Sequence, residues 1–205
     1  MVEEIVVREG AREDRVIEAL IEVPRHIFVD QGLWPKAYGD HALPIGCGQT
    51  ISQPSTVARM SELLEVDKSH RVLELGTGSG YQTAVLARLA RHVYSVERLR
   101  PIAEQARRNL RRLGVVNVSL KIDDGTLGWE DRGPFDRILV TAGGPELPAA
   151  LLAQLAAGGK LLIPVGGADR QRLVSVRRRA DGSLSESDEG GYSFVKLVGR
   201  HGWRE

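Results

Sequence analysis

Three glycines and one glutamate have the types and spacing needed to hold a nucleoside. Gly76, Gly78 and Gly80 stand at alternate positions between a short apolar run and a segment with helical spacing, and Glu97 follows the next apolar run. Glycine lets a ligand approach the main chain closely. A carboxylate at the end of the second strand of a βαβ unit can accept hydrogen bonds from ribose hydroxyls, and Glu97 lies 97 − 76 = 21 residues after Gly76, as such an acid should.

The spacing of the glycines distinguishes between ligands. A dinucleotide site needs its third glycine one residue later, and a phosphate loop needs a Gly-Lys-Ser/Thr ending that is missing here. A glycine loop with a ribose acid and no pyrophosphate cradle favours a nucleoside cofactor without phosphate, and S-adenosylmethionine (SAM) fits. The structural alternative is a tight strand–helix turn of another α/β protein, with Glu97 merely solvated.

Length and composition describe an ordinary globular chain. It has 205 residues, of which 42% are hydrophobic and 27% charged, and its formal net charge of +1 gives no global attraction to nucleic acid or anionic membranes. One cysteine, Cys47, allows no intrachain disulfide, and no apolar run approaches membrane-spanning length. We therefore expect a cytoplasmic protein with no nucleic-acid or membrane partner. His26, His41 and Cys47 lack ligand spacing, so we expect no metal, and without an exposed apolar stripe we expect a monomer.

Around the glycine loop, strands and helices alternate. The patterns predict strands at 71–75, 92–96, 118–122, 135–140 and 160–165, then two more at 172–178 and 192–198. Helices are expected at 9–23, from Pro54 to about 64, and at 81–90, 99–113 and 148–157. This order predicts an α/β, Rossmann-like fold: a mostly parallel, seven-stranded twisted sheet with helices on both faces and a C-terminal antiparallel strand pair.

We expect one domain, residues 1–205, in three parts. Residues 1–65 form an N-terminal helical segment that covers substrate and cofactor, 66–166 the SAM-binding core, and 167–205 the strand pair. Residues 30–53 show little periodicity but are rich in Gly, Pro and aromatic residues, so we interpret them as a binding segment folded over the cofactor site.

Several segments together resemble the protein-L-isoaspartate O-methyltransferases. They are VPRHIFV (23–29), ALPIGCGQTISQP (42–54), LELGTGSGYQTA (73–84) and SVER (95–98), with shorter matches at 124–125, 134–136 and 154–159. The glycine loop and Glu97 are shared by many SAM-dependent methyltransferases, whereas GQTISQP (48–54) is highly specific to this family. Two positions depart from the family's pattern: Asp123 replaces the first glycine of Gly-Asp-Gly, and Lys196 replaces a proline.

The resemblance implies a repair enzyme, a protein-L-isoaspartate(D-aspartate) O-methyltransferase. Such an enzyme transfers a methyl group from SAM to the α-carboxyl of L-isoaspartyl residues in damaged proteins and peptides, leaving S-adenosylhomocysteine. The acceptor carboxylate, with a pKa near about 3.5–4, is already ionised at neutral pH, and the sulfonium donor is already activated. No strong general base is needed, so we expect catalysis to come from alignment and exclusion of water.

The same resemblance implies the residues of the site. Ser52 is the expected catalytic residue, orienting the acceptor carboxylate or contacting SAM, and its structural alternative is a cap of the helix that begins near Pro54. Glu97 should hold the ribose and Asp124 should face the adenine amino group. The expected cofactor-binding residues are Thr50, Ser52, Glu74, Gly76, Thr77, Gly78, Gly80, Gln82, Glu97, Asp124, Gly125 and Thr141, and the expected substrate-binding residues are Ile45, Gln49, Thr50, Ile51 and Val195.

Two other functions stay open at the level of sequence. One is a SAM-dependent methyltransferase acting on RNA or a small molecule, which would use the arginines at 107–112 and 177–179, although no Asn/Asp-Pro-Pro-aromatic motif follows the fourth strand. The other is a non-catalytic SAM- or peptide-binding module.

Overall fold

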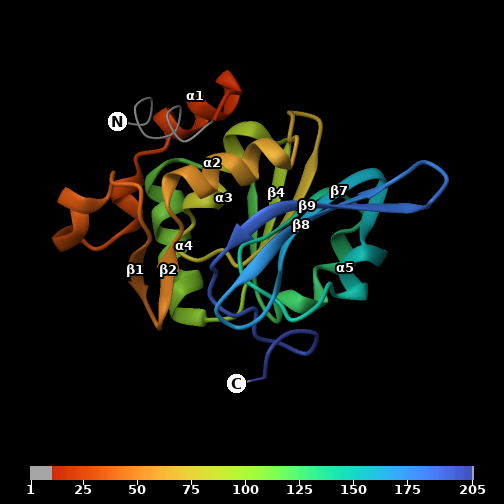
Figure 1. Ribbon diagram of the computed structural model, residues 1–205. Helices are drawn as coiled ribbons and strands as arrows, with labels where there is room; N and C mark the ends of the chain where they lie inside the picture. Colours follow the sequence, from red (N-terminus) through yellow and green to blue (C-terminus); the bar gives the residue numbers. More distant parts are fainter. Residues whose placement is uncertain (1–10, 205) are drawn as a thin grey trace.

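A seven-stranded sheet in the order β5-β4-β3-β6-β7-β8-β9 forms the centre of the molecule (Figure 1). The structure, a computed structural model, describes residues 11–204. Neighbouring strands from β5 to β7 run parallel, and β8 and β9 add an antiparallel pair at one edge, which confirms the predicted fold class. The strands are β3 (Arg71–Leu75), β4 (His92–Glu97), β5 (Val118–Ile122), β6 (Phe135–Val140), β7 (Leu155–Gly166), β8 (Gln171–Arg178) and β9 (Leu184–Tyr192).

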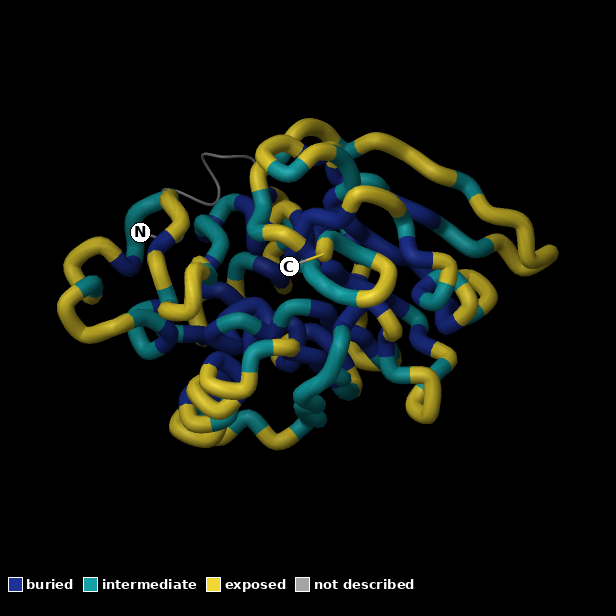
Figure 2. Tube along the Cα trace, turned by 90° about the horizontal axis from the view of Figure 1, so that it is seen from below, coloured by how far each residue is buried: buried dark blue, intermediate teal, exposed yellow. Residues whose placement is uncertain are grey.

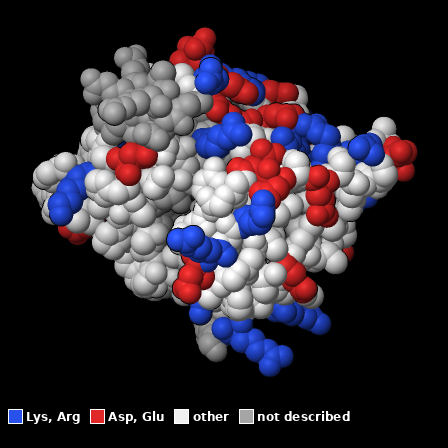
Figure 3. Space-filling model, in the orientation of Figure 1, with Lys and Arg blue, Asp and Glu red and all other residues white. Residues whose placement is uncertain are grey.

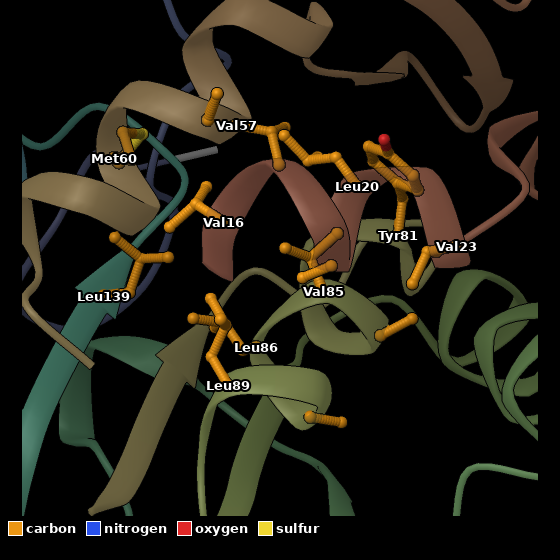
Figure 4. Close-up of a cluster of buried hydrophobic side chains, with 14 of the residues drawn as sticks. Val16, Leu20, Val23, Val57, Met60, Tyr81, Val85, Leu86, Leu89 and Leu139 are labelled. Atoms are coloured by element: carbon orange, nitrogen blue, oxygen red, sulfur yellow. The ribbon is translucent and has the colours of Figure 1, made fainter. Parts of the chain in front are cut away.

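Helices cover both faces of this sheet, and each face has its own apolar core. Side chains of successive strand residues point to opposite faces, so on β3 Val72 joins one core and Leu73 and Leu75 join the other. The first core packs against α1, α2 and α3, which Figure 4 shows meeting through Val16, Val57 and Val85, and the second packs against α5. The α-helices are α1 (Asp14–Glu22), α2 (Pro54–Leu63), α3 (Tyr81–Leu89), α4 (Arg100–Arg112) and α5 (Ala149–Ala153). Figure 2 shows the buried chain concentrated at the centre of the sheet.

The long N-terminal segment is structured despite its lack of periodicity. It contains the 3₁₀ turns η2 (Arg25–Phe28) and η3 (Gln31–Lys36), then the two-stranded antiparallel hairpin β1 (Leu43–Gly46) and β2 (Gln49–Ile51). Two further turns, η4 (Gly125–Leu127) and η5 (Glu130–Arg132), follow β5. No helix within residues 11–204 is both long and apolar enough to cross a membrane.

Three predicted boundaries were wrong. The last strand is Leu184–Tyr192, not 192–198, because this acidic edge strand pairs through its backbone and shows no apolar alternation. Strand β7 begins at Leu155, which pairs with Phe135, so the helix before it ends at Ala153. The first helix begins at Asp14, while positions 9 and 10 of the predicted helix lie outside the described residues.

A cluster of charged side chains around Glu65, which follows α2, connects this segment to the sheet. Glu65 accepts hydrogen bonds from Lys160 Nζ on β7 at 2.9 Å and from Arg177 Nη2 on β8 at 2.5 Å, and its carbonyl accepts one from Arg137 Nε at 3.1 Å. Partial burial alone would raise the pKa of Glu65, but the bonds from Arg177 and Lys160 outweigh it and lower this pKa from 4.5 to about 2. Glu65 is therefore charged in the folded protein well into the acid range.

Replacing Glu65 by Gln should lower thermal stability at pH 7 but not near pH 2. Because the folded-state pKa is lowered, the stabilisation is present above about pH 4.5 and is lost as the pH falls toward 2. The carboxylate is half exposed, so we expect a decrease in melting temperature of only roughly 1–4 °C at pH 7. Melting curves at pH 7, 4 and 2.5 measure it, with Glu104→Gln, on the exposed face of α4, as control; an equal loss at all three pH values would contradict the role of the charge.

Candidate active site

One cavity of about 460 Å³ opens at the carboxyl ends of the parallel strands. Its wall includes the residues that follow β3, β4, β5 and β6, which is the edge at which α/β sheets bind ligands. Two segments distant in sequence complete it: the end of the β1–β2 hairpin with the start of α2, and the C-terminal residues 194–198. The cavity is thus built from both ends of the chain around the glycine loop.

The glycine loop has the left-handed backbone that its residue types predict. Gly76 and Gly80 have φ angles of 94° and 90°, where a side chain would be strained. A Cβ on Gly76 would lie 2.5 Å from Thr141 Oγ1, which donates to the Gly76 carbonyl at 2.7 Å. A Cβ on Gly80 would press against α4, at 3.4 Å from Ala106. Gly76 lines the cavity and has no room for a side chain beside Thr141, whereas Gly80 lies outside the wall and allows α3 to pack closely on α4.

Glu97 is held in place by two backbone amides. Its side chain is nearly buried, Gly78 N donates to Oε2 at 2.9 Å, and Leu99 N donates to Oε1 at 3.0 Å. A carboxylate oxygen can accept more than one hydrogen bond, so each oxygen retains acceptor capacity on the cavity side. The fixed carboxylate beside the glycine loop fits the two hydroxyls of a ribose.

Glu74 lies behind the cavity wall and not in it. Its carboxylate is fully buried, and Oε2 accepts from Thr83 Oγ1 at 2.5 Å and from Ser95 Oγ at 2.6 Å. Because Ser95 gives its one hydroxyl proton to Glu74, Thr77 Oγ1 donates to Ser95 Oγ, at 2.6 Å. Burial raises the pKa of Glu74 to about 7 against the bonds from Ser95 and Thr83. Among the described residues, nothing hydrogen-bonds its Oε1.

Asp124 also lies outside the cavity wall, although the sequence places it at the adenine. Its Oδ1 accepts from Thr126 N at 2.8 Å, and its Oδ2 accepts from Arg200 N at 2.7 Å. The carboxylate thus binds the C-terminal segment, and its neighbour Gly125 provides the wall. Ile45 is likewise absent from the wall, beside Gly78.

Ser52 lies in the wall and does not cap α2. The N-cap of α2 is Gln53, which makes no side-chain capping bond, and no residue between 11 and 204 hydrogen-bonds the Ser52 hydroxyl. The capping acceptor comes from the preceding loop, because Asp40 Oδ1 accepts from Ser55 N at 2.9 Å. The Ser52 hydroxyl is therefore available to a ligand in the cavity.

A buried arginine holds the loop that carries Asp40. Arg25 is 1% exposed, and its Nε donates to the Ala37 carbonyl at 2.8 Å while Nη2 reaches the His41 carbonyl at 3.4 Å. Its guanidinium lies 4.9 Å from the centre of the Tyr81 ring, which lines the cavity. Burial lowers the pKa of Arg25, and Tyr81 and Asp40 oppose this effect.

Most of the expected site residues meet in this cavity. Glu74, Gly80, Asp124 and Ile45 lie outside its wall, and the wall includes further residues that sequence reasoning missed. Two of these, Ser79 and Lys196, adjoin predicted positions, and Lys196 is also one of the two departures from the family's pattern, but no local signal marks Ala168. The expected residues in the wall are Gln49, Thr50, Ile51, Ser52, Gly76, Thr77, Gly78, Gln82, Glu97, Gly125, Thr141 and Val195. No group of three or more His, Cys, Asp or Glu in the described part of the chain is arranged to hold a metal ion.

Residues 1–202 match the family model of protein-L-isoaspartate(D-aspartate) O-methyltransferase. The chain belongs to this family. A protein-L-isoaspartate O-methyltransferase of Geobacter metallireducens is 55% identical over 203 residues, covering 99% of this chain and 94% of that protein. The enzyme of that name from Trichlorobacter lovleyi is 52% identical over 204 residues, covering 100% of this chain and 94% of the relative.

Solved structures of the family share the whole fold. A protein-L-isoaspartate O-methyltransferase superposes with a TM-score of 0.88 at 33% identity, over 98% of this chain and 67% of that one. The Plasmodium falciparum PCMT in complex with S-adenosyl-L-homocysteine superposes with a TM-score of 0.83 at 26% identity, over 96% of both chains. The resemblance of the sequence segments to this family is confirmed.

Replacing Glu74 by Gln should remove a decline of stability with rising pH. Because the folded protein raises the pKa of Glu74 to about 7, it binds a proton that the unfolded chain releases, and stability falls as the pH rises from about 4.5 through 7. We expect the loss to reach on the order of 2–3 kcal/mol in the wild type and to be absent in Glu74→Gln. Urea unfolding at pH 5, 6, 7 and 8 measures it; parallel curves for the two proteins would contradict the shift.

Replacing Asp40 by Ala should loosen the start of α2. Loss of a capping acceptor costs about 0.5–2 kcal/mol, and Asp40→Asn, which keeps an acceptor oxygen, should restore most of it. Amide hydrogen exchange at Ser55 is the specific readout, because this amide loses its partner. Unchanged protection of Ser55 in Asp40→Ala would show that the bond does not stabilise the helix.

Proposed function

We propose that this chain transfers a methyl group from SAM to the α-carboxyl of L-isoaspartyl residues in damaged proteins and peptides. The main support for this proposal is the position of two sequence motifs in the structure. The family-specific segment 48–54 and the glycine loop with Glu97 border the same cavity, so an acceptor beside the first can meet a donor held by the second. S-adenosylhomocysteine is the expected product, and it is the ligand named for the Plasmodium falciparum structure.

At the cofactor end, the chain binds and orients the donor. Glu97 would accept hydrogen bonds from the ribose hydroxyls, and Gly78 N and Leu99 N hold its carboxylate in place. Gly76 and Gly125 give the ligand close access to the main chain. When bound, SAM supplies a methyl group already activated on a sulfonium.

At the acceptor end, the chain orients a carboxylate that needs no deprotonation. Ser52 donates its free hydroxyl to one oxygen of the acceptor, which leaves the other oxygen to face the methyl group. Gln49, Thr50, Ile51 and Val195 surround this position, and backbone groups of the hairpin pair with an extended peptide. The sequence alternative of Ser52 as a cap has no support, since Asp40 caps α2.

Three of the arginines that favoured RNA are bound within the protein. Arg177 binds Glu65, Arg178 donates to the Leu152 carbonyl at 2.6 Å, and Arg107 donates to the Leu120 carbonyl at 3.2 Å. Because these three guanidinium groups already have partners and the formal net charge is only +1, we propose isoaspartyl proteins and peptides as partners and no nucleic acid or membrane.

We also propose that the protein acts as a cytoplasmic monomer and as one domain. The core on the α1 face supports one domain, because it joins Val16 of the segment 1–65, Val72 of 66–166 and Leu173 of 167–205. A segment that contributes to a common core has no separate core of its own.

Transfer of labelled methyl from SAM to paired synthetic peptides tests the function. The peptides are identical except for L-isoaspartyl in one and L-aspartyl in the other. Base-labile label on the isoaspartyl peptide alone is the expected result. Label on neither peptide, with SAM binding confirmed by calorimetry, would refute the proposal and direct the search to RNA, to small-molecule acceptors or to a binding function without catalysis.

Replacing Ser52 by Ala should lower kcat on the isoaspartyl peptide by roughly ten- to a hundredfold, because the acceptor carboxylate loses its orienting donor. SAM affinity should fall much less. Kinetics with the peptide and calorimetry with SAM measure both, with Ser187→Ala on β9 as matched control. Undiminished turnover with intact SAM binding would refute the role of Ser52.

A further inference from the structure

We infer that Lys196 selects isoaspartyl acceptors that carry an acidic residue beside the isoaspartyl. This inference rests on the proposed function and concerns the acceptor end of the cavity. Among the cavity-lining residues of the hairpin, of the loop after β6 and of the C-terminal segment, Lys196 is the one charged side chain. The two other charged residues of the wall, Glu97 and Arg98, follow β4 at the cofactor end.

The backbone of Lys196 is fixed on both sides. Gly143 N donates to the Val195 carbonyl at 2.8 Å, and Leu197 N donates to the Gly143 carbonyl, also at 2.8 Å. Val195 and Leu197 belong with the core on the α5 face, whereas Lys196 is exposed. The lysine therefore leaves a rigid segment at the cavity and is not part of a free tail.

The ammonium group of Lys196 lies near an aromatic ring and not beside a described carboxylate. Its Nζ lies 5.9 Å from the centre of the Trp203 ring, and Trp203 Nε1 donates to the Gly143 carbonyl at 2.9 Å. An aromatic face attracts a cation but has no counter-charge. Within residues 11–204, no carboxylate forms an ion pair with Lys196.

The same segment carries two further cations, and the Asp124 carboxylate accepts a hydrogen bond from Arg200 N in it. Residues 190–204 contain Lys196, Arg200 and Arg204 and no Asp or Glu. Figure 3 shows Lys and Arg atoms projecting at the lower edge of the molecule, where Figure 1 places the C-terminal end. A cation next to the acceptor position attracts a carboxylate of the bound peptide and repels an ammonium. Partly exposed charge pairs change binding by roughly two- to fivefold each, and salt screens them.

Three isoaspartyl peptides test the inference, with Glu, Gln or Lys on both sides of the isoaspartyl residue. The quantity measured is the ratio of kcat/KM for the Glu peptide to that for the Lys peptide. We expect a ratio of roughly tenfold in the wild type at low salt, a ratio near one in Lys196→Gln, and a reversed preference in Lys196→Glu. Arg112→Glu, an exposed site on α4 with the same change of net charge, should keep the wild-type ratio. High salt should reduce the wild-type ratio.

The outcomes separate this inference from the proposed function. If Lys196→Gln and Lys196→Glu show the same Glu-to-Lys peptide ratio of kcat/KM as the wild type, the inference is overturned. The proposed function still stands in that case if the wild type methylates the Gln peptide. An equal change of the ratio in Arg112→Glu would also overturn it, because net charge would then be the cause. No methylation of the Gln peptide by the wild type would overturn the proposed function, and this inference with it.

Discussion

The hydrogen bond from Gly78 N to the Glu97 carboxylate is the contact on which the site depends. It joins the loop after β3 to the end of β4, and Leu99 N completes the hold on the same carboxylate. Because the carboxylate is nearly buried, the two amide donors supply hydrogen bonds in place of water. The loop can approach Glu97 only with the left-handed backbone that its glycines permit. The shape of the proposed nucleoside site is thus set mainly by the backbone of the glycine loop.

Behind this contact, a chain of hydroxyls connects the cavity wall to the interior. Thr77 in the wall donates to Ser95, and Ser95 donates to the buried Glu74. Two residues of β4 therefore hold the glycine loop: Ser95 through the Thr77 hydroxyl and Glu97 through the Gly78 amide. Glu74 on β3 thus stabilises the loop from the interior of the protein. It does not line the cavity, whereas backbone atoms of the glycine loop do.

The acceptor side of the cavity is assembled from segments that are remote from the sheet's centre. The hairpin and Ser52 are held by Asp40 at the start of α2 and by Arg25 beneath the loop. The C-terminal segment is held by Gly143 and by the bond from Arg200 N to Asp124. The proposed donor site is thus placed by the sheet, while the residues proposed to meet the peptide lie on segments attached to the sheet by a few hydrogen bonds.

The sequence by itself determined the parallel sheet and the glycine loop with an acid at the end of the next strand, because these follow from local backbone preferences and from strand–helix periodicity. The family followed from the resemblance of several segments, above all 48–54. Through the family's motif the sequence also predicted a site at Gln49, Thr50, Ile51 and Ser52, and these residues line the same cavity as the glycine loop. It misplaced the last strand, because an acidic edge strand such as Leu184–Tyr192 buries no face and leaves no periodic signal. Only the tertiary structure decided that Asp40 and not Ser52 caps α2, that Glu74 and Asp124 turn away from the cavity, and that Lys196 enters its wall. Each of these depends on a contact between residues far apart in the chain, which burial and hydrogen bonding fix in three dimensions and which no local pattern encodes.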